Sequence, residues 1–149
     1  MGVYYYSLNI SNEFDMPQVT LPPVKPKITV LANSIDLDLA TDFIAFLKDR
    51  GIDVESHDAT DFEAINEDDF IVILGGPDAS ESVGEIVQEV LTENEENTVR
   101  EAGAKKMFVK QSVWADGQKV IVFAGADRNL TAAAHLESRD SLLSEIDIE

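Results

Sequence analysis

Apolar and polar positions change their spacing along the chain, and the changes predict a sheet covered by helices. Nearly continuous apolar runs occur at 28–32, 70–74 and 120–124, and such runs are typical of strands buried on both faces. After the first run, apolar residues recur at helical spacing from Leu37 to Leu47, which predicts a helix that ends before the next glycine. The pattern is that of an α/β protein.

Two further strand patterns carry polar residues at intervals, which favours sheet edges. Residues 52–57 alternate between apolar and polar and lead into an acidic link at 58–69. Residues 107–114 and 118–124 flank an Asp-Gly pair at 116–117, a strong signal for a tight hairpin. We therefore expect the last two strands to pair antiparallel.

The other segments predict helices. An apolar stripe marks a helix at 83–91, and a short helix should follow it and end near Gly103. Residues 129–146, rich in Ala and Leu and free of Gly and Pro, predict a single last helix. Two capping-box patterns, each a Ser or Thr followed three residues later by Glu, mark the starts of the helix at 83–91 and of the short helix after it. They are Ser82 with Glu85, and Thr92 with Glu95.

Burial and handedness together predict the strand order. The three continuous apolar strands belong in the centre, and right-handed crossovers then give the order 2-1-3-5-4, with strand 4 antiparallel at one edge. This is a three-layer α/β/α sandwich with a mostly parallel, five-stranded sheet of flavodoxin-like or Rossmann-like type. A Rossmann-like half with another strand order is the alternative.

Residues 1–27 differ in composition from the single α/β domain expected over 28–149. They contain four of the five prolines and three adjacent tyrosines, Tyr4 to Tyr6. Because proline favours extended backbone, we expect an extended arm. Packing on the domain's own sheet edge or on a neighbouring subunit would bury the tyrosines, and disorder is the alternative.

Charge and composition exclude several classes of function. With 29 acidic and 11 basic residues, the net charge of -18 would repel nucleic acids and anionic membranes. The absence of cysteine excludes disulfides, thiolate metal sites and cysteine nucleophiles. The chain has neither a membrane-spanning apolar stretch nor an export signal as written, so we expect a cytoplasmic protein. A cell-surface location is the alternative if an export signal is missing from the sequence.

The candidate site lies where the central strands end. In an open parallel sheet, ligands bind at the carboxyl ends of strands next to the point where the strand order reverses. A glycine turn there can hold an anion on its backbone N–H groups, but acidic Asp78, Glu81 and Glu85 oppose an anion. No cofactor is identified. We expect no metal site, since His57 and His135 have no strong ligand at metal-binding spacing. The candidate ligand-binding residues are Asn33, Asp36, Gly75, Gly76, Asp78, Gly125, Asp127 and Arg128.

The turn at 75–77 also resembles the oxyanion-hole turn of class I glutamine amidotransferases. Those enzymes need a cysteine nucleophile, and this chain has none. We therefore expect no catalytic residues, with a divergent enzyme as the alternative.

Residues 70–134 resemble a domain of archaeal surface-layer and surface-layer-like proteins. Three motifs carry the resemblance: Ile-Leu-Gly-Gly-Pro at 73–77, the strand pair with its short turn at 110–125, and Ala-Gly-Ala-Asp-Arg at 124–128 followed by Thr131 and an alanine-rich helix. The resemblance covers less than half of the chain. It implies a non-catalytic domain that associates with a protein partner or with copies of itself.

Two functional hypotheses follow from these patterns. The first is assembly with proteins, related to surface-layer domains and without catalysis. The second is binding of a small ligand or nucleotide in the crevice at the strand ends. An open crevice with Arg128 pointing into it beside Asp36 would favour the second hypothesis, whereas a filled turn would contradict it.

Overall fold

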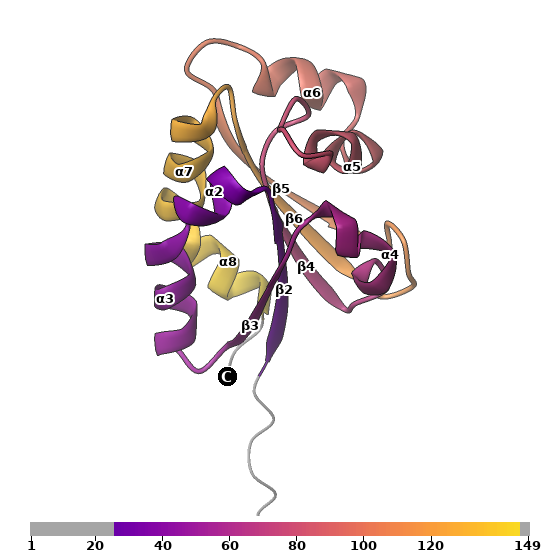
Figure 1. Cartoon of the computed structure of the whole chain (residues 1–149), viewed down its shortest axis with the longest axis vertical. Helices are drawn as coiled ribbons and strands as arrows, with labels where there is room; N and C mark the ends of the chain where they lie inside the picture. Colours follow the sequence, from indigo (N-terminus) through magenta and orange to yellow (C-terminus); the bar gives the residue numbers. More distant parts are fainter. Residues whose placement is uncertain (1–25, 147–149) are drawn as a thin grey trace, which may run out of the picture.

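Five strands form one sheet in the computed structural model, which describes residues 26–146 (Figure 1). The strand order is β3-β2-β4-β6-β5, and all neighbours pair parallel except β5 and β6, which pair antiparallel. Numbered along the chain this is 2-1-3-5-4, which confirms the predicted order. The strands are β2 (Lys27–Ala32), β3 (Asp53–His57), β4 (Phe70–Leu74), β5 (Lys105–Gln111) and β6 (Lys119–Gly125).

Helices cover both faces of the sheet, as expected for a three-layer α/β/α sandwich. One face is covered by α2 (Ser34–Asp38), α3 (Thr41–Asp49), α7 (Arg128–Glu137) and α8 (Arg139–Ile146) (Figure 1). The other face is covered by α4 (Phe62–Ile65), α5 (Val83–Val90) and α6 (Glu93–Val99), with a short 3₁₀ helix at Ala59–Asp61 before α4.

The central strands are apolar throughout because both of their faces are buried. In β4, Val72 and Leu74 pack on the side of α3 and α7, whereas Ile71 and Ile73 pack on the side of α5. All four side chains are fully buried. Each contributes roughly 1.5–3 kcal/mol through removal of apolar surface from water. This two-sided burial fixes β4 at the centre and places its carboxyl end between two helical layers.

Two predicted helices are each divided in the structure. The helix expected from Leu37 to Leu47 is α2 and α3, which are separated at Leu39 and Ala40. The helix expected over 129–146 is α7 and α8, separated at Ser138.

Both halves of the divided last helix reach the core. Ala134 of α7 and Leu142 of α8 are buried in the same apolar cluster. The acidic link expected at 58–69 contains two short helices that the sequence patterns did not predict. They are the 3₁₀ helix and α4, and Ile65 of α4 packs on the sheet.

Of the two predicted capping boxes, only the second forms. The Thr92 hydroxyl accepts a hydrogen bond from Glu95 N at 3.2 Å, and Thr92 N donates to Glu95 Oε1 at 2.9 Å. The prediction at Ser82 was wrong, since its backbone is left-handed with φ of 69° and its side chain makes no capping hydrogen bond. The helix after Thr92 ends at Val99, a few residues before Gly103.

The hairpin between β5 and β6 is antiparallel as predicted, but its turn is not tight. The last paired residues are Gln111 and Lys119, so residues 112–118 form a longer loop. Gln118 closes the base of this loop, because its carbonyl accepts a hydrogen bond from Ser112 N at 2.7 Å. Its side chain is buried, and its amide donates to the carbonyls of Asn66 at 2.8 Å and Asp68 at 2.7 Å.

No helix within residues 26–146 has both the length and the apolar character needed to cross a bilayer. The arm predicted over 1–27 lies outside the described residues except at its end, where Lys27 begins β2.

Candidate functional site

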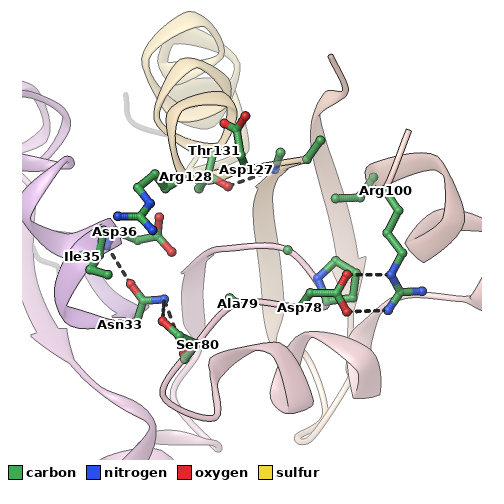
Figure 2. Close-up of a pocket in the computed structure, with 15 residues that line it drawn as sticks. Asn33, Ile35, Asp36, Asp78, Ala79, Ser80, Arg100, Asp127, Arg128 and Thr131 are labelled. Atoms are coloured by element: carbon green, nitrogen blue, oxygen red, sulfur yellow. Dashed lines mark hydrogen bonds and ion pairs between the residues drawn. The ribbon is translucent and has the colours of Figure 1, made fainter. Parts of the chain in front are cut away.

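A pocket of about 220 Å³ opens at the carboxyl ends of β2, β4 and β6, where the sequence predicts a crevice (Figure 2). The structure brings seven of the eight candidate residues to its wall. They are Asn33, Asp36, Gly76, Asp78, Gly125, Asp127 and Arg128. Their spatial proximity follows from the strand order, while their binding of a ligand stays a prediction.

Gly75, the eighth candidate, lies behind the wall and supports it. Its φ of 145° is in the region that favours glycine. A β-carbon there would lie 3.0 Å from Ala79 Cβ and 3.5 Å from Asp36 Oδ2. A side chain at Gly75 would therefore meet the turn and the Asp36 carboxylate.

Asn33 holds two walls of the pocket together. It follows β2 and caps α2, because its Oδ1 accepts a hydrogen bond of 2.7 Å from Asp36 N. Its amide donates to Ser80 Oγ at 3.1 Å, which lies in the loop after β4 (Figure 2). Asn33 is buried, so these bonds also satisfy its polar atoms.

A second contact joins the same two loops at the surface. Ser34 donates to Glu81 through its backbone N–H at 3.1 Å and through its hydroxyl at 2.6 Å. These hydrogen bonds lower the pKa of Glu81. Glu81 and Ser82 both have left-handed backbone, with φ of 59° and 69°, and this conformation is uncommon outside glycine. The loop after β4 thus has a specific, clamped shape.

Asp36 is the most unusual group of the pocket. Only 5% of the residue is exposed, and its Oδ1 has no hydrogen-bond partner within residues 26–146. Burial raises its pKa, and the polar side chain of Asn33 and the charge of Arg128 oppose this shift only in part. A buried carboxyl oxygen without a partner costs roughly 1–3 kcal/mol. Figure 2 shows the carboxyl group facing the space between the strand ends.

Arg128 begins α7 and lies beside Asp36 (Figure 2). The preceding Asp127 caps the helix, because its carboxylate accepts a hydrogen bond of 2.8 Å from Leu130 N. Among the described residues, Arg128 forms no ion pair, and its charge reaches Asp36 without a direct contact between the two side chains. Its guanidinium is therefore available to a ligand.

The turn after β6 is packed closely against α7. The Gly125 N–H donates to the buried Thr131 hydroxyl at 3.0 Å. A β-carbon on Gly125 would overlap the backbone between Leu130 and Thr131, so only glycine fits. This close approach places the first turn of α7 at the mouth of the pocket.

On the opposite wall, Asp78 and Arg100 form a two-point ion pair. Arg100 Nε and Nη2 donate to the two carboxylate oxygens at 2.8 Å and 2.9 Å. The pair lowers the pKa of Asp78 and raises that of Arg100. The sequence suggests that Asp78 and Glu81 repel an anion at this turn. In the structure, Arg100 pairs with Asp78 and offsets its charge, whereas the hydrogen bonds from Ser34 keep Glu81 ionised.

The two histidines lie away from the pocket wall. His57, at the end of β3, contacts Asp61 through Nδ1 at 2.9 Å and Glu55 through Nε2 at 3.0 Å. His135 is fully buried against Phe43 on the other side of the sheet from α5. No group of three or more His, Cys, Asp or Glu residues within 26–146 is arranged to hold a metal ion.

Sequence reasoning missed eight lining residues. Arg100 does not follow a strand, so the strand-end rule does not find it. It reaches the pocket because it lies at the C-terminus of α6. Ser80 lies in the loop that follows β4, so the rule that places ligands at strand ends would have found it if applied to the whole loop. The eight are Ile35, Pro77, Ala79, Ser80, Val99, Arg100, Ala126 and Thr131.

No protein-family model matches the chain, and no curated protein matches it. The resemblance to surface-layer domains therefore stays a prediction based on its three short motifs.

Proposed function

We propose that this protein is a small-ligand-binding domain whose site is the pocket at the carboxyl ends of β2, β4 and β6. The observation that carries the proposal is the Asp36 carboxyl group, which is buried at the pocket wall and has an oxygen without a partner in the described part of the chain. Native proteins rarely leave such an atom unsatisfied. A ligand that donates a hydrogen bond to the Asp36 carboxyl group, which faces the pocket, would offset the cost of burying it.

The size and the charges of the pocket support this function. Pockets for drug-sized ligands measure roughly 300–1,000 Å³, so a volume of about 220 Å³ suits a small, polar molecule. Arg128 adds a cationic group beside Asp36, which is the arrangement that favours ligand binding over a purely structural turn. The absence of a nucleophile paired with a base among the described lining residues supports binding rather than covalent catalysis.

An NMR screen with uniformly ¹⁵N-labelled protein tests the proposal. The compounds are carboxylic acids, sugars, sugar phosphates, nucleosides and nucleotides, each at millimolar concentration. We expect at least one compound to shift the amide resonances of Gly76, Ala126 and Arg128. The variant Ala126→Trp fills the mouth of the pocket from an exposed position and should abolish these shifts.

Ala45→Trp is the matched control, because Ala45 is an exposed alanine on α3 outside the pocket. It should leave the response unchanged. Ligand binding at this pocket is rejected if no compound class shifts these resonances, or if the shifts persist in Ala126→Trp.

Assembly with proteins is the second candidate function. Three exposed, large apolar side chains favour it: Ile35 and Leu39 lie at α2, and Leu136 lies on α7, which contacts α2. Such groups are candidate contacts for a protein partner or for a second copy of the chain. Sedimentation velocity across salt and calcium concentrations tests this function, and a strictly monomeric profile would contradict self-association.

A further inference from the structure

Two polar groups of the pocket have no hydrogen-bond or ion-pair partner within residues 26–146, and they define what a ligand must offer. Most other polar side chains of the wall are engaged. Arg100 pairs with Asp78, Asp127 caps α7, and Thr131 accepts from Gly125 N. The unmatched groups are the Oδ1 atom of Asp36 and the guanidinium of Arg128. They lie side by side on the same wall.

Each of these groups selects a chemical partner. The planar guanidinium of Arg128 binds the two oxygens of a carboxylate or the oxygens of a phosphate. Its position in the first turn of the ten-residue helix α7 adds the positive end of a helix dipole. The Asp36 carboxyl group, which faces the pocket, accepts a hydrogen bond from a donor. A hydroxyl group suits it best, because a hydroxyl can donate to the carboxylate and can also accept if Asp36 is protonated.

The charge around the pocket limits the negative charge of the ligand. The whole chain carries -18, and three acidic side chains line the pocket against two arginines, one of which is already paired. A phosphate monoester carries nearly two negative charges at neutral pH, and nucleoside diphosphates and triphosphates carry more. A carboxylate carries one, which matches the single available arginine. The volume of about 220 Å³ likewise favours a small molecule.

Resting on the proposed ligand-binding function, we propose that the pocket binds a small hydroxy acid. Arg128 binds its carboxylate, and Asp36 accepts a hydrogen bond from a hydroxyl group near that carboxylate. The walls that hold these two groups are fixed by the Asn33 contact with Ser80 and by the close packing of Gly125 on α7.

Isothermal titration of the purified protein with four probes tests this ligand class. Gluconate has a carboxylate and hydroxyls, acetate has only the carboxylate, glucose has only hydroxyls, and inorganic phosphate is the competing anion. We expect gluconate to bind at least tenfold more tightly than each of the other three. Tighter binding of phosphate or glucose, or no binding of gluconate, overturns the proposal.

Two variants test whether Arg128 and Asp36 bind gluconate. Arg128→Gln and Asp36→Leu should each weaken gluconate binding tenfold or more, and circular dichroism checks that both remain folded. The control Arg50→Gln removes the same charge at an exposed arginine that stacks on Phe46, outside the pocket. Undiminished gluconate binding in both pocket variants contradicts the proposal. If gluconate does not bind, but another compound of the NMR screen binds the wild-type protein and not Ala126→Trp, the proposed ligand class is wrong and the ligand-binding function stands.

Discussion

The carboxylate of Asp36 lies against the backbone of Gly75, so closely that a β-carbon on Gly75 would be 3.5 Å from Asp36 Oδ2. The buried acid and the strand end are thus in van der Waals range of each other. The tighter contact is with Ala79, whose Cβ would lie 3.0 Å from a β-carbon on Gly75.

We expect Gly75→Ala to lower the free energy of unfolding by roughly 1–3 kcal/mol, because the substitution forces alanine into a glycine conformation and against Ala79. Urea denaturation measures this change. Gly51→Ala is the control: Gly51 also has positive φ, at 81°, but a β-carbon there meets open space. A loss in Gly51→Ala as large as that in Gly75→Ala would contradict a role for the contact with Ala79 and Asp36.

Asp36→Asn should stabilise the free protein at pH 7, because it removes the charge of a carboxylate whose burial raises its pKa. The pKa of Asp36 is raised in the folded state, so the native protein binds a proton more readily than the unfolded chain. The penalty is therefore present above the folded pKa and disappears as pH falls below 3.8, the unfolded value.

Urea denaturation at pH 7 and at acidic pH tests the sign of this effect. The gain from Asp36→Asn should shrink as the pH is lowered. An equal gain at both pH values would show that the charge of Asp36 is not its cause.

His135 should make the fold sensitive to acid. Burial against Phe43 and Phe123 lowers its pKa to about 4 from 6.5, so between these values the unfolded chain binds a proton that the native protein does not. Stability is then lost as pH falls from 6.5 towards 4, by up to about 3 kcal/mol. In His135→Phe this part of the pH dependence should be absent.

His57 provides a control of opposite sign. Hydrogen bonds to Glu55 and then to Asp61 raise its pKa, so its contribution is present below the unfolded value of 6.5 and is lost as pH rises through the folded pKa. The slope of unfolding free energy against pH, measured for His135→Phe and His57→Gln, should change in opposite directions. Equal slopes in His135→Phe and the wild-type protein would contradict the role of His135.

Thr131→Val should destabilise the protein by roughly 1–3 kcal/mol. The substitution keeps the shape of the side chain but removes the acceptor of the Gly125 N–H, which is then buried without a partner. Thr98→Val is the matched control, since the exposed Thr98 hydroxyl only donates to the Asn94 carbonyl within α6. Thermal unfolding of the two variants compares them, and equal losses would contradict the proposed role of the buried bond.

The strand order and the place of the pocket could be predicted because continuous apolar runs in the sequence indicate strands that are buried on both faces. Residues 70–74 and 120–124 are apolar throughout, which places them at the centre and brings their glycine turns together. The shape of the pocket could not be predicted in the same way. Arg100 reaches it because α6 ends there, and that position depends on how the helix packs rather than on a local pattern.

The burial of Asp36 also could not be predicted from the sequence patterns. An aspartate in the first turn of a helix is usually a solvated residue that interacts with the helix dipole. Here Asp36 lies in the short α2, where its backbone N–H donates to the Asn33 cap and its carboxylate lies beside Gly75. The division of the last helix at Ser138 was missed because the local residue preferences are helical on both sides.

The hydrogen bonds that join Asn33 to Ser80 and Ser34 to Glu81 have a kinetic consequence. They connect the loops that follow β2 and β4, so under the proposed ligand-binding function a ligand would meet a site that is already formed. Association should then occur in one step. Its observed rate in stopped-flow measurements should rise in proportion to ligand concentration and show no plateau, because no slow rearrangement precedes or follows the encounter.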